Sequence, residues 1–309
     1  MTPSPPSAHP SGISLNHVTK NFGRKQVLTD VTADLPAGRI YGLLGSNGVG
    51  KTTLMSLICG HQFRTGGHIL IDGIDPVENP LVLQRTCFVH EDQLYNDAFS
   101  VRDILAVIPA FYPTWSAETA DRLVTRFRLP LDTKSKKLSR GQRSALAITL
   151  SLASRAAYTF LDEPYLGLDA SSRSILYDEL LAEYAAHPRT FIISTHLIDE
   201  VADLMEEVVV LEDGVVAVQT DVDEARAACF IVRGREAEVR TLVGDREILT
   251  ERHLGTILSA TVRGAVTPHD RTLAERTHLT IEAASLQEFV AALGLHALDE
   301  VARKTEVAS

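Results

Sequence analysis

A glycine-rich octapeptide that ends in Lys and Thr carries the clearest chemistry in the sequence. The stretch GSNGVGKT, residues 45–52, fits the pattern G-x-x-x-x-G-K-[ST], follows the apolar run IYGLL and precedes the helix-like TLMSLICG. Glycines let backbone N–H groups turn toward phosphate oxygens, and the following helix presents the positive end of its dipole to the same anion. We therefore predict a phosphate-binding loop rather than a plain glycine-rich turn. Lys51 is expected to reach the β- and γ-phosphates, and Thr52 to place its hydroxyl on Mg²⁺.

Two adjacent carboxylates form the second candidate site. In the segment FLDEP, residues 160–164, an apolar strand ends at Asp162 and Glu163. Asp162 is suited to binding Mg²⁺ through water, and Glu163 is suited to orienting an attacking water. An Asp-Glu pair after a strand is more often a solvated turn, so this assignment depends on the phosphate loop.

Three more motifs follow the expected order along the chain. They are LSRGQ at residues 138–142, GLD at 167–169 and STH at 194–196. Together with the phosphate loop and the FLDEP strand, this set resembles the ABC ATPase family, and the resemblance covers residue 13 to about residue 220. In that family the corresponding elements are the signature sequence, the Walker B strand with its catalytic glutamate, the D-loop and the switch histidine.

The resemblance implies an ATP molecule held between two cassettes, with the phosphate loop of one facing the signature sequence of the other. Catalysis then falls to Glu163, His196 and Lys51, and Mg²⁺ binding to Thr52, Asp162 and Glu91. The residues that the resemblance places on ATP are Phe22, Gly45, Ser46, Asn47, Gly48, Val49, Gly50, Lys51, Thr52, Thr53, Ser139, Arg140, Gly141, Gln142 and Asp169.

Several of these residues also have an ordinary structural explanation. Ser139 and Asp169 each precede a helix-like stretch, so each is also an expected helix N-cap. Phe22, expected to stack on adenine, would usually be a core residue when taken alone. A histidine between a strand and a helix, as His196 is, would more often be structural without the surrounding motifs.

Two positions depart from the family pattern. Arg140 stands where the signature sequence commonly has Gly, and Glu91 stands in the loop where the family commonly has Gln. Glu91 still accepts hydrogen bonds, but it carries a charge that Gln lacks. Because Lys51, both carboxylates of the FLDEP segment and His196 are all present, we still expect ATP hydrolysis.

The elements that must position these residues indicate an α/β fold of the P-loop, ABC-ATPase type. Strand-like runs come first, at residues 13–18, 27–35, 40–44 and 68–71, followed by a helical subdomain at about 98–156 broken by prolines. Strands and helices then alternate, which predicts a parallel sheet closed by a hairpin at Asp213-Gly214. We predict a flexible tail at 1–12, an ABC ATPase domain at 13–220 and a small α+β accessory domain at 221–309.

Composition narrows the class of protein. Hydrophobic residues make up 45% and charged residues 23% of the 309 residues, which is typical of a globular protein with a real core. The net charge of −10 makes nucleic acid an unexpected partner. Three widely spaced cysteines, Cys59, Cys87 and Cys229, suggest buried reduced thiols rather than a disulfide framework or a zinc site.

No run of the sequence is apolar enough to cross a membrane, and the first residues do not form a secretory signal. The resemblance is strongest to transporter subunits, particularly bacterial export-type ones. It implies a cytoplasmic ATPase, peripheral on the inner face of the membrane, that pairs with a second ABC subunit and a separate transmembrane permease. The alternatives are a soluble ABC ATPase without a permease, or a poorly hydrolysing cassette paired with another subunit.

Overall fold

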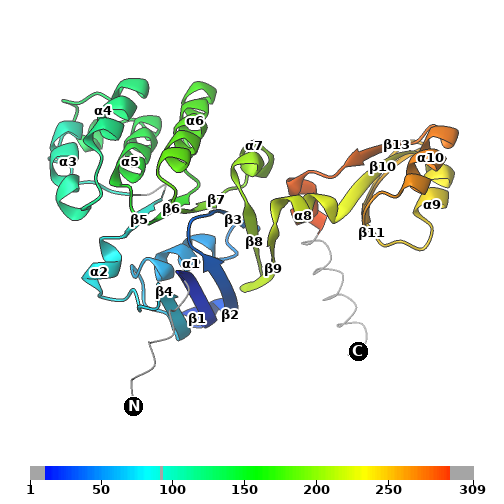
Figure 1. The fold of residues 1–309 in the computed structure, drawn as a ribbon, viewed down its shortest axis with the longest axis horizontal. Coiled ribbons are helices and arrows are strands. Elements are labelled where there is room, and N and C mark those ends of the chain that lie inside the picture. Colours follow the sequence, from blue (N-terminus) through cyan, green and yellow to red (C-terminus); the bar gives the residue numbers. More distant parts are fainter. Residues whose placement is uncertain (1–10, 91–92, 293–309) are drawn as a thin grey trace, which may run out of the picture. The chain divides into compact units, whose positions relative to one another are not determined.

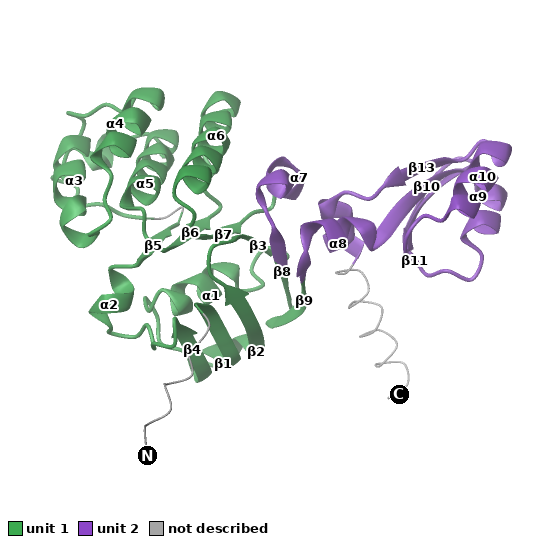
Figure 2. Cartoon of the chain, in the orientation of Figure 1, with its two compact units in different colours: residues 1–196, 209–219 green, residues 197–208, 220–309 purple. Residues whose placement is uncertain are grey.

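The computed structural model describes residues 11–90 and 93–292. The chain divides into two compact units, unit 1 at residues 1–196 and 209–219, and unit 2 at residues 197–208 and 220–309. Figure 2 shows this division. The sequence-based domain boundary at residue 220 remains our proposal.

Unit 1 begins with an antiparallel layer. β1 (Gly12–Phe22) pairs with β2 (Lys25–Pro36) and with β4 (Gly66–Ile71), antiparallel in both cases. Buried and exposed residues alternate along much of β2, because one face of such a layer packs on the core and the other meets water. The predicted strands in this region are confirmed.

A parallel layer continues the same sheet. β3 (Ile40–Leu44), β7 (Thr190–Ser194), β6 (Tyr158–Asp162) and β5 (Thr86–Val89) lie side by side and parallel, and every residue of the four is buried. The sheet has nine strands in the order β4-β1-β2-β9-β8-β3-β7-β6-β5. Strands covered on both faces are continuously apolar, which is why these four read as short unbroken apolar runs.

The hairpin that contributes the remaining two strands forms where the sequence predicts it. β8 (Glu207–Glu212) and β9 (Val215–Asp221) are joined at Asp213 and Gly214, whose φ angles are +45° and +77°. Two consecutive left-handed residues are the signature of a tight turn whose twist matches the strands.

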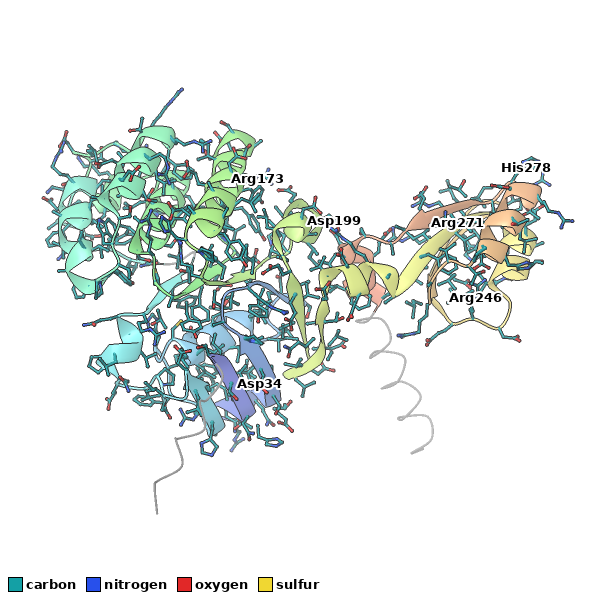
Figure 3. All side chains as sticks on the ribbon, viewed as in Figure 1. Asp34, Arg173, Asp199, Arg246, Arg271 and His278 are labelled. Carbon is teal, nitrogen blue, oxygen red and sulfur yellow. The ribbon has the colours of Figure 1, made fainter. Side chains whose placement is uncertain are left out.

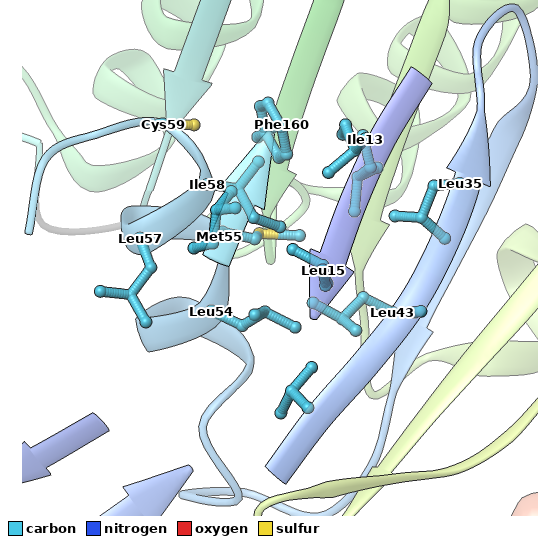
Figure 4. Packing of buried hydrophobic residues seen from close by; sticks show 14 of the residues in the cluster. Ile13, Leu15, Leu35, Leu43, Leu54, Met55, Leu57, Ile58, Cys59 and Phe160 are labelled. Carbon is cyan, nitrogen blue, oxygen red and sulfur yellow. The ribbon is translucent and has the colours of Figure 1, made fainter. Parts of the chain in front are cut away.

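Helices flank the sheet of unit 1. α1 (Lys51–Ile58) follows β3 directly, and Figure 4 shows its side chains Leu54, Met55 and Leu57 among those of the strands. A helical subdomain contains α3 (Val101–Val107), a 3₁₀ turn (Ile108–Phe111), α4 (Ala117–Arg126) and α5 (Arg140–Ser154), and α6 (Ala170–Ala186) follows β6 (Figure 1). Shorter pieces are α2 (Pro80–Leu83) and the 3₁₀ turn Ser135–Lys137.

Unit 2 has its own sheet and core. After α7 (Ile198–Val201), a 3₁₀ turn (Ala202–Leu204) and α8 (Val222–Ala227) come β10 (Cys229–Arg235), α9 (Glu236–Val243), β11 (Ile248–Leu254), β12 (Ile257–Arg263), α10 (Pro268–Thr277) and β13 (Thr280–Ala283). The antiparallel order β11-β12-β10-β13 with a β-α-β-β-α-β sequence is the split βαβ, ferredoxin-like arrangement.

One face of this small sheet packs on its two helices. Phe230 and Val232 of β10 meet Val239 of α9 and Leu258 of β12 in the core of unit 2. Arg246 pairs with Asp270 of α10 at 2.7 Å, and Figure 3 labels Arg246 among the side chains of this unit. The expected small α+β fold at the C-terminal side of the ATPase domain is confirmed.

Two further expectations concern the described residues as a whole. All three cysteines are buried and free, as the sequence suggests. No helix within residues 11–90 and 93–292 has the length and apolar character needed to cross a bilayer.

Candidate functional site

The glycine-rich loop joins the carboxyl end of β3 to the first residue of α1. Gly45, Gly48 and Gly50 have φ angles of +136°, +81° and +114°. A Cβ on Gly45 would lie 2.3 Å from the Leu211 carbonyl oxygen, so only glycine fits there. Gly50 is the N-cap of α1 and has no side chain to occupy the first amide groups, which leaves them available to an anion.

Lys51 lies folded over this loop. Its ammonium group donates to the carbonyl oxygens of Gly45 at 2.8 Å and Ser46 at 3.1 Å, and the residue is only 7% exposed. Burial lowers the pKa of Lys51, while the nearby carboxylates of Glu163 and Asp162 act in the opposite direction. A phosphate bound at the loop would place a compact anion beside this buried cation.

Thr52 and Asp162 supply hard oxygen atoms beside the loop. The Thr52 hydroxyl donates to Asp162 Oδ2 at 2.5 Å, and the Ser194 hydroxyl donates to Asp162 Oδ1. A hydroxyl and a carboxylate suit Mg²⁺, which is usually held by one or two protein oxygens together with phosphates and water. Within the described residues, no group of three or more His, Cys, Asp or Glu side chains has an arrangement that could hold a metal ion. Glu91, the third predicted metal residue, lies outside the described residues.

Glu163 follows Asp162 in a left-handed conformation, with φ at +50°. Its backbone N–H donates to the carbonyl oxygen and the hydroxyl oxygen of Ser194, which fixes the turn. Glu163 Oε2 lies 2.8 Å from His196 Nδ1 and accepts a hydrogen bond from the Tyr165 hydroxyl. Burial raises the pKa of Glu163, and His196 and Lys51 oppose this increase.

The signature residues lie at the start of α5. Ser139 is the N-cap, its hydroxyl accepting from the Gln142 N–H at 3.2 Å while Gln142 Oε1 accepts from the Ser139 N–H at 3.0 Å. The expected capping role of Ser139 is confirmed, and the one expected for Asp169 is too, because its carboxylate accepts from Ser172 N–H at 2.7 Å. These caps leave the proposed ATP contacts untested.

The signature helix is in close contact with the GLD turn. A Cβ on Gly141 would lie 2.6 Å from the Gly167 carbonyl oxygen, and a Cβ on Gly167 would lie 2.8 Å from Arg140 Cγ. The Ser144 hydroxyl donates to the Leu166 carbonyl oxygen at 2.6 Å. The start of α5 and the turn after β6 are therefore packed together within this chain.

The structure thus brings the predicted residues together in two groups. One contains Lys51, Thr52, Asp162, Glu163 and His196 at the carboxyl ends of β3, β6 and β7, where ligands bind in open parallel sheets. The other contains the signature residues and the GLD turn.

Phe22 lies in neither group. Phe22 is 48% exposed at the end of β1, and Lys20 Nζ lies 4.6 Å from the centroid of its ring. The alternative that Phe22 is a core residue is therefore wrong.

Sequence reasoning missed two polar residues beside the carboxylates. Tyr165 contacts both Glu163 and His196. Gln93 lines a cavity of about 20 Å³ together with Tyr95, Asp162 and Glu163, which is room for about one water molecule. Tyr165 has a weak sequence signal, its place two residues after Glu163, whereas the position of Gln93 depends on the packing of its loop.

A larger cavity of about 690 Å³ lies elsewhere in unit 1, at the amino ends of β6 and β7. Its three arginines already have acidic partners. Arg85 pairs with Asp72 at 2.6 Å, Arg155 with Glu183 at 3.2 Å, and Arg189 with the same Glu183 at 3.6 Å. We therefore assign no ligand to this cavity.

Comparison with known proteins gives a consistent picture. A family model described as "ABC transporter" matches residues 28–166. The chain is 31% identical over 214 residues to the ABC transporter ATP-binding protein YtrB of Bacillus subtilis, covering 69% of this chain and 73% of that protein. It is 31% identical over 210 residues to the Nod factor export ATP-binding protein I of Burkholderia lata, covering 65% and 68%. It is 30% identical over 211 residues to the sulfate/thiosulfate import ATP-binding protein CysA of Escherichia coli K12, covering 65% of this chain and 58% of that relative.

Solved structures show the same fold. The structure of an ATP-binding subunit of an ABC transporter superposes with a TM-score of 0.63 at 23% identity, covering 70% of this chain and 92% of that one. A dimeric post-hydrolysis state of the cassette MJ0796 bound to ADP and Pi gives a TM-score of 0.60 at 21% identity, covering 68% and 98%.

Proposed function

The chain belongs to the ABC transporter family as an ATP-binding subunit, and from this premise we propose that it hydrolyses ATP and drives a separate transmembrane permease. The proposal of ATP hydrolysis rests on one observation. Five side chains cluster beside the glycine-rich loop, namely those of Lys51, Thr52, Asp162, Glu163 and His196. This cluster combines a phosphate anchor, oxygen ligands for a divalent cation and a base, which are the parts that phosphoryl transfer to water requires.

Each side chain has a distinct task in this proposal. The loop amides and Lys51 hold the β- and γ-phosphates, and His196 steadies the γ-phosphate from the other side. Glu163 orients the attacking water and accepts its proton. Thr52 and Asp162 hold Mg²⁺, which neutralises the charge that develops on the phosphate oxygens when it is bound.

We further propose that two cassettes close on ATP. The N-terminus of α5 is already capped by Ser139 and Gln142, yet Ser139 and Arg140 remain exposed. In a dimer, this helix end would face the γ-phosphate bound to the other subunit, with Ser139, Arg140 and Gly141 nearest to it. The Asp169 turn would lie at the same interface, because the GLD turn packs against Gly141.

Coupling to a permease places the protein at the cytoplasmic face of a membrane, without insertion. Support comes from the relatives, which are named as ATP-binding proteins of import and export systems. Because both directions occur among them, the proposal concerns coupling to a permease rather than the direction of transport.

The test is purification of a tagged chain from membranes, followed by measurement of ATP turnover with and without the proteins that accompany it. We expect a hydrophobic partner in the membrane fraction and a change in turnover when it is removed. Recovery only from the soluble fraction, with no hydrophobic protein attached after crosslinking, would contradict the permease assignment. A complex that never hydrolyses ATP would instead contradict the catalytic one.

A further inference from the structure

Tyr165 lies at the point where Glu163 and His196 meet. It is 3% exposed, and its ring packs edge-on against the His196 ring, with centroids 5.3 Å apart and an interplanar angle of 71°. Its hydroxyl accepts from the His196 backbone N–H at 2.9 Å and from the Thr195 hydroxyl at 3.1 Å. The same oxygen contacts Glu163 Oε2 and lies 2.9 Å from His196 Nδ1.

The hydrogen bonds of this phenol determine where its proton goes. A tyrosine hydroxyl has one proton to donate and two lone pairs to accept with. The His196 N–H and the Thr195 hydroxyl occupy both lone pairs, so the proton is left for an acceptor. The Glu163 carboxylate is that acceptor, because its Oε2 contacts the phenol oxygen.

The contact with Glu163 determines which nitrogen of His196 carries a proton. His196 Nδ1 is 2.8 Å from Glu163 Oε2, and two groups that both lack a proton cannot form a hydrogen bond. Nδ1 therefore carries a proton and donates it to Glu163. Nε2 points away from this contact on a side chain that is 47% exposed, so it is the nitrogen available to a phosphate.

From this geometry we propose that Tyr165 is a positioning residue for ATP hydrolysis, whose hydroxyl orients the Glu163 carboxylate and holds His196 with its proton on Nδ1. The inference rests on the proposed catalytic function of Glu163 and His196. Tyr165 joins two residues that are 33 positions apart in the chain and come from different strand ends. A phenylalanine at residue 165 would keep the ring contact and leave the contact between Glu163 and His196 Nδ1, but it would remove every hydrogen bond that the phenol makes.

The kinetic test compares Tyr165→Phe with Tyr184→Phe in the full chain. Tyr184 is the matched control, since its hydroxyl donates to the Gly38 carbonyl oxygen at 2.8 Å. We expect Tyr165→Phe to lower kcat about tenfold, because Glu163 remains present but is less well oriented as a general base. The KM for ATP should change less than twofold. Tyr184→Phe should leave both parameters unchanged. An unchanged kcat in Tyr165→Phe would overturn the proposal.

The spectroscopic test does not depend on turnover. Nitrogen-15 NMR of the imidazole of His196 in the wild-type chain should report a proton on Nδ1. Tyr165→Phe removes the donor that orients Glu163, so the carboxylate can turn away from Nδ1 and a mixture of the two tautomers should appear. A wild-type His196 protonated on Nε2 alone would overturn the proposal even if kcat falls in the variant. If the wild-type protein does not hydrolyse ATP at all, the proposed function fails by itself. The change of tautomer between the wild type and Tyr165→Phe then decides whether Tyr165 positions His196, and an unchanged tautomer would overturn the proposal.

Discussion

Thr52 and Asp162 share a hydrogen bond of 2.5 Å although they are 110 positions apart in the chain. Thr52 belongs to the first turn of α1, and Asp162 is the last residue of β6. The phosphate loop and the carboxylate strand are therefore held in one fixed relation. The two oxygen atoms are close enough to serve one small cation.

The first prediction concerns this oxygen pair. Thr52→Ala removes one of the two oxygens proposed for Mg²⁺. Half-maximal ATP turnover should then require about tenfold more Mg²⁺, which is at the lower end of the loss in metal affinity seen when groups that support a metal site are removed. Thr52→Ser retains the hydroxyl and should behave as the wild type. Turnover measured against Mg²⁺ concentration at fixed ATP checks this. Coincident curves for Thr52→Ala and wild type would remove Thr52 from the metal site.

The second prediction concerns the exposed ring of Phe22. Phe22→Ala should weaken ATP binding by about 1–3 kcal/mol if the ring stacks on adenine. Phe111→Ala is a suitable control, because Phe111 is 60% exposed in the helical subdomain. Titration with a fluorescent ATP analogue measures both affinities. Equal affinity in the two variants would mean that Phe22 does not contact the base.

The third prediction uses the close approach of Gly141 to Gly167. Gly141→Ala places a Cβ 2.6 Å from the Gly167 carbonyl oxygen, so the start of α5 or the GLD turn must move. The phosphate loop lies in the other group of site residues, so ATP should still bind with wild-type affinity while turnover falls about tenfold or more. Binding and turnover assays on the same preparation separate the two effects. Normal turnover would show that the position of the signature helix is not critical.

Much of this arrangement follows from local sequence patterns. The phosphate loop is predictable because glycine spacing, a preceding apolar strand and a following helix all point to one structure. The Asp213-Gly214 turn is predictable because few residue pairs accept two left-handed conformations in a row. The N-caps Ser139 and Asp169 follow from side chains that can bond their own helix, which is a contact within three residues.

Other features depend on contacts that no local pattern records. The roles of Tyr165 and Gln93 arise from residues brought together by the strand order of the sheet. In unit 2, the sequence pattern does not indicate α8, α9, β11 or α10. β11 has the sequence ILTERHL, and its last four residues are exposed, so it lacks the alternation that marks a half-buried strand. In the alternating part of the chain, the helical pattern of residues 197–206 predicts one helix, whereas the structure has the shorter α7, which ends at Val201, followed by a 3₁₀ turn.

The fourth prediction concerns acid stability in unit 2. Hydrogen bonds from Arg246, followed by those from Thr267, lower the pKa of Asp270 from its usual 3.8 to about 2. Because the unfolded chain binds this proton more readily, the pair stabilises the fold above about pH 4, and the contribution is lost as the pH falls through 2. With the Arg246 side chain 30% exposed, solvent screening reduces the contribution to roughly 1–2 kcal/mol.

Hydrogen exchange of peptides from β10 and α10 in the full chain measures this local stability. Asp270→Asn should lower protection at pH 6 by a factor of about 10 and make it less dependent on pH between 6 and 3 than in the wild type. Equal protection in the two proteins at pH 6 would show that the ion pair does not stabilise unit 2.

The fifth prediction addresses the catalytic step itself. Glu163→Gln keeps the shape of the side chain but removes the carboxylate that is proposed to accept a proton from water. Turnover should then fall by roughly 10²–10⁴, while ATP still binds, because Lys51 and the loop amides are unchanged. Glu118→Gln, an exposed residue in the first turn of α4, makes the same chemical change and should leave turnover normal.

The same variant tests the closed dimer. If ATP lies between the phosphate loop of one subunit and Ser139 and Gly141 of the other, slow hydrolysis should let the nucleotide-bound pair accumulate. Size-exclusion chromatography with Mg²⁺ and ATP should then give a dimer for Glu163→Gln and a smaller dimer fraction for the wild type. A Glu163→Gln protein that hydrolyses normally would remove the catalytic assignment. A slow variant that stays monomeric at high concentration would instead favour a different cassette or the permease as the obligatory partner. Two copies of this chain would then not be enough to enclose the nucleotide.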